Sequence, residues 1–140
     1  MRARCVPSAV PLLDAHVALG PDISEMPSAP KVASAVRGLI PFPVRTTEPR
    51  VVADGARASI LLPLEPSARL TDLQHRLGST GFEPHVVVVQ GVEHDGIEQS
   101  LREVQGWRLN FFWTVRDVDI VGLETGTIWR SLGVFRLSRP

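Results

Sequence analysis

Runs of hydrophobic residues, separated by polar, proline and glycine residues, divide the chain into short segments. Two of these runs begin with a histidine: "HVALG" at residues 16–20 and "HVVVVQG" at residues 85–91. Four consecutive valines in a run of this length are typical of a buried strand, because β-branched side chains pack well on a pleated surface. We interpret the first run as a strand of the same kind.

Two segments carry the periodicity or the end signals of helices. In residues 30–39, "PKVASAVRGL", Pro30 lies in the expected first turn. Backbone N–H groups there have no partner within the helix, so a proline costs no hydrogen bond. In residues 67–77, leucines recur at i, i+3 and i+7 and so form one helical face, and Gly78 follows. The sequence therefore predicts a helix in each segment.

A third helix is predicted over residues 95–105. Asp95 is the expected N-cap, and Glu98 is its expected partner in a capping box, three residues further on. The apolar stripe of this helix consists of Ile97, Leu101 and Val104, and Gly106 follows its last turn.

Four further segments predict extended chain. The stretch "PFPV" at 41–44 is extended because each proline biases the residue before it away from helix. Residues 58–64, "ASILLPL", predict a buried strand, and "NFFWTV" at 110–115 predicts a second extended stretch. Two strand-like runs around "ETGT" at 124–127 predict a closing hairpin.

The order of these elements suggests an internal repeat. Residues 14–64 and 65–140 each hold a histidine-led strand, a helix, an extended stretch and a closing strand, whereas residues 1–13 form a poorly defined N-terminal segment. We therefore predict one α+β domain over residues 1–140. Its expected architecture is two-lobed, with pseudo-two-fold related βαβ-like units and mainly antiparallel sheets that flank a central groove.

Composition limits the partners of such a domain. The formal net charge is zero, which argues against strong, sequence-independent electrostatic binding to duplex nucleic acid. A local arginine pocket could still hold a small phosphate-bearing ligand, and Arg45, Arg130 and Arg136 are candidates for it. No stretch approaches the roughly 20 apolar residues that span a bilayer, so a membrane protein is not expected.

The N-terminal stretch and the single cysteine favour the cytoplasm. Pro7, Pro11 and Asp14 interrupt the first apolar run, so it does not qualify as a signal peptide. Cys5 alone can form neither an internal disulfide nor a cysteine-based zinc site, and a reducing compartment is the default expectation.

The two leading histidines are the candidate catalytic residues. Residues two apart on a strand share a face, so His85 is expected to face the same way as Val87 and Val89, opposite to Val86 and Val88, and His16 the same way as Ala18. In two symmetric lobes, both imidazoles would line the central groove. A pair of imidazoles suits acid and base catalysis near neutral pH.

This arrangement resembles the two-histidine phosphoesterase superfamily, which includes 2′,5′-RNA ligase-like proteins and cyclic nucleotide phosphodiesterases. The family carries one His-x-Thr/Ser motif in each lobe, and "HVAL" at 16–19 and "PHVVV" at 84–88 are similar to the two copies. The resemblance implies hydrolysis or ligation of a cyclic or 2′–5′ phosphodiester of RNA or a nucleotide. His16 and His85 would divide the acid and base roles, without a metal or another cofactor.

The chain departs from the family at the hydroxyl positions. Ala18 and Val87 stand where the family has Thr or Ser, whose hydroxyls contact the phosphate. A hydrogen bond to a charged group contributes about 1.5–3 kcal/mol. Losing both would therefore slow the reaction by roughly 10²–10⁴-fold if both act in the transition state.

These departures leave two alternatives open. The first is a catalytically degenerate member of the fold that binds RNA, a nucleotide or a protein partner without turnover. The second is an α+β domain whose histidines are purely structural. The fifteen residues before His16 also leave little room for the strand and helix that usually precede the first motif, so the lobe is trimmed or the chain starts too far downstream.

The remaining candidates are given structural roles. His75 is expected on an exposed helix face, and His94 in a loop before a helix. A metal site is disfavoured because carboxylate and cysteine partners at ligand spacing are absent. Core packing is favoured over base stacking for the aromatic residues Trp107, Phe111, Phe112, Trp113, Trp129 and Phe135.

Overall fold

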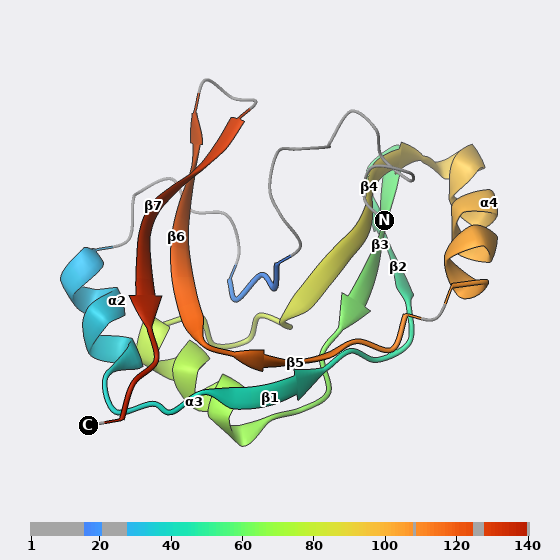
Figure 1. The fold of residues 1–140 in the computed structure, drawn as a ribbon. Coiled ribbons are helices and arrows are strands. Elements are labelled where there is room, and N and C mark those ends of the chain that lie inside the picture. The colour runs from blue at the N-terminus through green and yellow to red at the C-terminus, as the bar shows by residue number, and fades with distance from the viewer. Residues whose placement is uncertain (1–15, 21–27, 108, 125–127, 140) are drawn as a thin grey trace. The chain divides into compact units, whose positions relative to one another are not determined.

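The computed structural model describes residues 16–20, 28–107, 109–124 and 128–139 (Figure 1). The part of the chain that it describes contains three helices and seven strands, and the paired strands run antiparallel. The prediction of an α+β fold with mainly antiparallel sheets is therefore confirmed.

The chain divides into two compact units that are interleaved in sequence. The first unit comprises Met1–Ala18, Arg45–Glu65 and Glu83–Phe111, and the second comprises Leu19–Val44, Pro66–Phe82 and Phe112–Pro140. Each unit therefore takes segments from both predicted cycles, 14–64 and 65–140, and the units do not coincide with the cycles.

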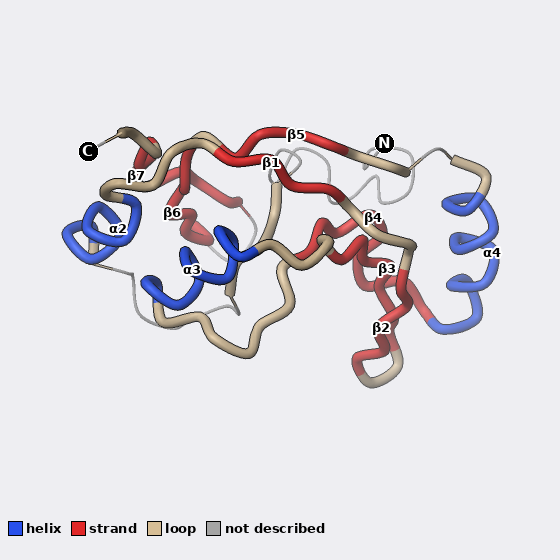
Figure 2. Tube along the Cα trace, turned by 90° about the horizontal axis from the view of Figure 1, so that it is seen from below, coloured by secondary structure: helices blue, strands red, loops and turns tan. Residues whose placement is uncertain are grey.

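The first unit is built around a three-stranded antiparallel sheet with the order β2-β3-β4. The strands are β2 (Arg50–Asp54), β3 (Arg57–Pro63) and β4 (His85–Glu93). Helix α4 (His94–Gln105) follows β4 directly and lies beside the sheet (Figures 1 and 2). Strand β3 confirms the buried strand predicted at residues 58–64.

One face of this sheet forms the core of the unit together with α4. Leu62 pairs with Val86, and Ile60 pairs with Val89, which gives β3 and β4 a shared apolar face. The buried cluster comprises Ala58, Ile60, Leu62, Val88, Val89, Ile97, Val104 and Leu109. Burial of each large aliphatic side chain contributes about 1.5–3 kcal/mol, so this cluster is the main source of the unit's stability.

The second unit contains two helices and two strand pairs. Helices α2 (Ala29–Val36) and α3 (Ala68–Leu77) lie against each other. The guanidinium of Arg76 on α3 donates to the carbonyls of Ala35 and Arg37 at the end of α2. The strand pairs are β1 (Phe42–Arg45) with β5 (Phe112–Val115), and β6 (Asp117–Glu124) with β7 (Ile128–Arg136).

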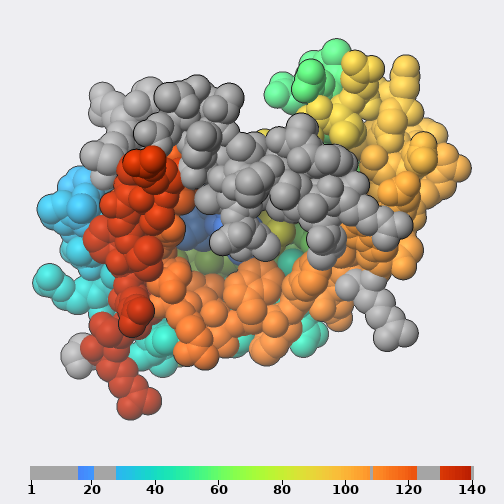
Figure 3. Space-filling model, turned by 45° about the horizontal axis from the view of Figure 1, so that its top comes forward, coloured from blue at the N-terminus to red at the C-terminus, as the bar shows by residue number. Residues whose placement is uncertain are grey.

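The β6–β7 pair confirms the predicted closing hairpin, although part of its expected turn, residues 125–127, lies outside the described residues. Strand β7, red in Figure 3, carries two exposed apolar side chains, Leu132 and Val134. None of the helices in the described ranges has the length and apolar character needed to cross a membrane.

The ends of α3 follow the sequence signals, whereas the start of α4 does not. The Ser67 hydroxyl accepts from the Leu70 N–H at the start of α3, and Gly78 takes the left-handed conformation (φ 77°) at its end. Helix α4 begins at His94, with Glu93 as an N-cap that makes no side-chain capping bond. The predicted Asp95 cap is therefore wrong, because β4 runs directly into the helix and places Asp95 in the first turn, where its charge complements the helix dipole.

A bulge in β4 changes the predicted alternation of the valines. His85, Val86 and Val87 pair in sequence with β3, but the register shifts before Val89, so that Val88 and Val89 are both buried. The expectation that Val89 faces the same way as His85 is therefore wrong. An extra residue in one strand turns the following side chains toward the opposite face.

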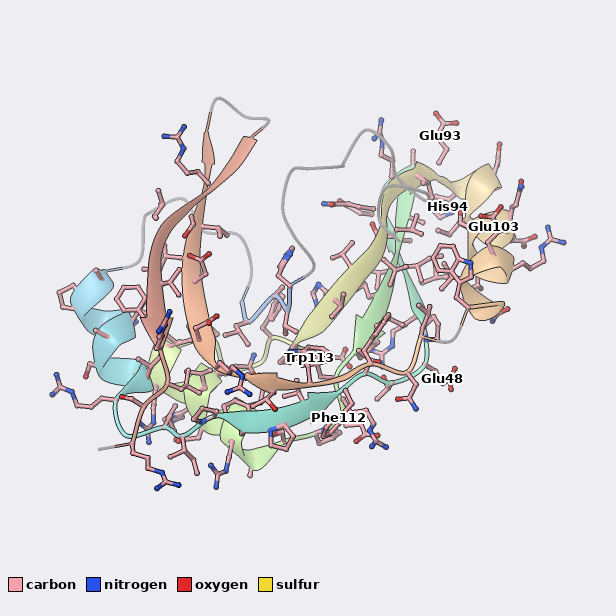
Figure 4. The ribbon with its side chains drawn as sticks, in the orientation of Figure 1. Glu48, Glu93, His94, Glu103, Phe112 and Trp113 are labelled. Atoms are coloured by element: carbon pink, nitrogen blue, oxygen red, sulfur yellow. The ribbon has the colours of Figure 1, made fainter. Side chains whose placement is uncertain are left out.

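The aromatic residues only partly fill the core. Trp107 and Phe111 pack against the buried cluster of the first unit, as predicted. Phe112 is 63% exposed, so the core prediction is wrong for this residue. Phe112 and Trp113 leave β5 on opposite sides (Figure 4), as neighbours on a strand must. Phe135 is half-buried, and the side chain of Trp129 lies outside the described part of the chain.

Candidate functional site

His85 is the first residue of β4, and it is half-buried. Its Nδ1 lies 2.8 Å from the carbonyl oxygen of Glu83. A carbonyl oxygen can only accept a hydrogen bond, so Nδ1 carries the proton and donates it. In the neutral imidazole the lone pair then resides on Nε2.

The segment that carries His16 lies next to His85. Ala18 forms an isolated antiparallel bridge with His85, and its N–H donates to the His85 carbonyl at 3.0 Å. Because β3 already pairs with one edge of β4, this bridge lies on the other edge. The predicted first strand is wrong in the described residues 16–20, where a single bridge stands in place of a ladder.

The structure gathers both histidines into the first unit, instead of placing one in each lobe as expected. Residues directly opposite in an antiparallel pair project to the same face, so the Ala18 side chain lies on the His85 face. Val87 lies on this face as well, because no bulge separates it from His85. The apolar residues Ala18 and Val87 therefore both neighbour His85.

A cation also lies on this face of the sheet. Arg50 on β2 pairs with Leu61 on β3, and Leu61 pairs with Val87 on β4, so the three form one row across the sheet. The Arg50 guanidinium contacts the Glu83 carboxylate at 2.6 Å, and both side chains are more than half exposed. Arg50 thus contacts the residue whose carbonyl accepts from His85, and this contact is an exposed ion pair that contributes little to stability.

The arginines chosen from the sequence have different positions. Arg45 is exposed in the first unit, at the end of β1, whereas Arg130 and Arg136 are exposed on β7 of the second unit. Arg50 was not predicted, because its place in one row with Val87 depends on the register of three strands. The only sequence signal is its position at the start of an extended run.

The other two histidines belong to the helices α3 and α4. His75 is exposed on α3, as predicted. His94 is the first residue of α4 instead of a loop residue, and its Nε2 donates to the carbonyl of Gly55 at 3.2 Å. Figures 3 and 4 show this junction of the β2–β3 turn with the end of β4. A hollow of about 290 Å³ there is lined by Ala56, Arg57, Glu93, His94 and Asp95.

Within the described ranges, no three side chains of the His, Cys, Asp and Glu types gather closely enough to hold a metal ion. The His85 imidazole, the Arg50 guanidinium and the Glu83 carboxylate are the ionisable groups described above.

The chain matches no protein-family model and no curated protein.

Proposed function

We propose that the first unit carries a paired-histidine site that acts on a cyclic or 2′–5′ phosphodiester of RNA or a nucleotide. The observation that carries this proposal is the bridge between Ala18 and His85, which brings the two histidine-led segments together at one edge of the sheet. An extended chain through residues 16–18 would place His16 on the same side as Ala18, and hence on the His85 face.

His85 is the general base in this proposal. Its Nδ1–H is held by the Glu83 carbonyl, which orients the ring and stabilises the imidazolium that forms when Nε2 accepts a proton. Nε2 removes a proton from the attacking water as the new O–P bond forms. His16 donates a proton to the leaving oxygen as the old P–O bond breaks, so one proton is taken up and one is released in each turnover.

Arg50 is the candidate anion contact of the site. A guanidinium carries five N–H donors, so it can hold a phosphate oxygen and the Glu83 carboxylate together. Ala18 and Val87 offer no hydroxyl to the phosphate. We therefore expect a slow enzyme, with transition-state contacts fewer than in a site that has both hydroxyls.

A second candidate function is binding of the same nucleotide or RNA terminus without turnover. The two apolar side chains beside His85 favour it, because they remove donors that would stabilise the transition state more than the bound ground state.

Hydrolysis of nucleoside 2′,3′-cyclic phosphates tests the enzyme proposal. Wild type should turn over, whereas His85→Ala and His16→Ala should lose at least about 100-fold, as expected for removal of a general acid or base. His75→Ala is the matched control, because His75 is exposed on α3 in the other unit, and it should retain wild-type turnover. Equal rates in all four proteins would reject the proposal.

A binding measurement separates the two candidates. Titration of a cyclic nucleotide while tryptophan fluorescence is recorded reports binding whether or not chemistry follows. Saturable binding that His85→Ala weakens, without any turnover in wild type, would establish the second candidate instead of the first.

A further inference from the structure

Strand β2 forms an edge of the first unit's sheet. The sheet order is β2-β3-β4, and within the described ranges no strand pairs with the outer side of β2. All five residues of the strand are exposed, including Val51 at 39% and Val52 at 41%. An edge strand with exposed valines presents unpaired backbone groups to any chain that can lie beside it.

The hairpin geometry determines which backbone groups of β2 point outward. A two-residue turn, Gly55–Ala56, joins Asp54 to its partner Arg57. The pair that flanks such a turn is hydrogen-bonded, and hydrogen-bonded and non-hydrogen-bonded pairs then alternate along the ladder. The backbone groups of Asp54, Val52 and Arg50 therefore point toward β3. Those of Val51 and Ala53 point away from it.

The sequence of β2, "RVVAD", is complementary to itself when it is read in the opposite direction. With a second copy centred on Val52, Val51 of each chain lies opposite Ala53 of the other. These are the residues whose N–H and C=O groups point outward, so each such pair forms reciprocal hydrogen bonds. Val52 then faces its own counterpart in the non-hydrogen-bonded position, where side chains approach most closely.

The charges at the strand ends match in the same register. Arg50 of each copy lies opposite Asp54 of the other, and opposite charges in this cross-strand position stabilise the pairing. The Arg50 guanidinium, 57% exposed, can reach a second carboxylate while it keeps its contact with Glu83. Pro49 occupies the next outward position and has no N–H, so the ladder ends there.

We propose that β2 is a self-association surface at which a second copy of this chain pairs antiparallel about a two-fold axis through Val52. The two sheets then form one continuous sheet through both copies. The charge order of the strand identifies the partner, because an unrelated chain would need acidic and basic residues in this same reversed order. The inference rests on β2 alone and does not depend on the proposed phosphoesterase activity.

The association is expected to be weak. A ladder of five residues buries well below the roughly 1,200 Å² that begins the range of stable protein interfaces. Sedimentation equilibrium of the full chain from about 10 µM to about 1 mM should therefore show a reversible monomer–dimer equilibrium. A wild-type protein that remains monomeric throughout this range would overturn the proposal.

Charge variants test the register. In Asp54→Arg, two arginines face each other at both ends of the paired strands. In Arg50→Asp, two aspartates do so. Each variant alone should therefore weaken dimerisation by at least about tenfold. An equimolar mixture of the two variants restores both attractive pairs and should dimerise at least as well as wild type. Self-association of either variant at wild-type strength, or a mixture that does not associate, would overturn the register.

A backbone variant tests the hydrogen bonds. Val51→Pro removes an outward N–H but no bond to β3, so it should abolish dimerisation and leave the monomer folded. Val51→Ala keeps the N–H and is the matched control, which should still dimerise. Thermal unfolding of each variant confirms that its monomer is intact. Dimerisation of Val51→Pro equal to that of Val51→Ala would contradict the proposal even if a charge variant failed to fold.

Discussion

At the scale of the residue, the site is determined by what surrounds His85. The Glu83 carbonyl fixes the proton on Nδ1, and Ala18 lies opposite His85 on the neighbouring segment. The sequence predicted the face shared by His85 and Val87, because alternation holds until the bulge. It could not predict Arg50, because no local pattern encodes a contact across three strands.

The proposed function leads to a gain-of-function prediction at the two apolar positions beside His85. Ala18→Thr and Val87→Thr each place a hydroxyl beside His85, and a hydrogen bond to a charged phosphate contributes about 1.5–3 kcal/mol. Each variant should therefore raise kcat/KM for a nucleoside 2′,3′-cyclic phosphate by roughly 10- to 100-fold. Val86→Thr is the control, because Val86 packs on the core side of the same strand, and its rate should not rise. A gain in the control alone would refute this assignment of faces.

At the scale of the element, one buried hydroxyl joins two segments of the first unit. Thr46 is 4% exposed, and its Oγ1 donates to the Leu109 carbonyl at 2.9 Å and accepts from the Phe111 N–H at 3.0 Å. Its side chain thus satisfies two backbone groups just before β5, where the chain has no ladder of its own to do so.

Removal of this hydroxyl should therefore be costly. Thr46→Val keeps the shape of the side chain but leaves a buried carbonyl and a part-buried N–H without their partner, and we expect a loss of about 2–4 kcal/mol. Thr46→Ser keeps the hydroxyl and should lose only about 1 kcal/mol, from one methyl group. Urea unfolding measures both changes. Equal losses would show that packing, and not the hydrogen bonds, determines the stability at this position.

The elements were predictable where local physics decides them. The helix at 68–77 has a serine cap, a leucine face and a glycine in the left-handed conformation, and all three signals are local. The bulge at Val88 was not predictable, because four identical valines give no signal of where the register shifts. The pattern at residues 16–18 predicts a strand, but the structure gives these residues a single bridge, Ala18 with His85, which no local pattern encodes.

At the scale of the whole molecule, the two units share one chain that passes repeatedly between them. Each unit is assembled from three separate stretches, so forming one unit closes the loops from which the other is built. The entropy of loop closure then couples the two. The sequence pattern suggested two consecutive cycles instead, because short-range periodicity carries no information about which segments associate.

This coupling predicts a single unfolding transition. Trp107 belongs to the first unit and Trp113 to the second, so variants that retain only one of them report each unit separately. The two double variants are Trp113→Phe/Trp129→Phe and Trp107→Phe/Trp129→Phe. In each of them, the guanidinium concentration at the midpoint of unfolding should be the same by fluorescence as by circular dichroism. If the fluorescence midpoint lay below the circular-dichroism midpoint in one variant and above it in the other, the units would unfold independently.

The central claim is that His16 and His85 act as a pair within one unit, and a double-mutant cycle on turnover tests it most directly. Residues that act as a unit are strongly non-additive, so His16→Ala/His85→Ala should be no slower than the more damaging single variant. The assay uses a nucleoside 2′,3′-cyclic phosphate, and the measured quantity is kcat. Losses that multiply in the double variant, or single variants as fast as wild type, would contradict the claim.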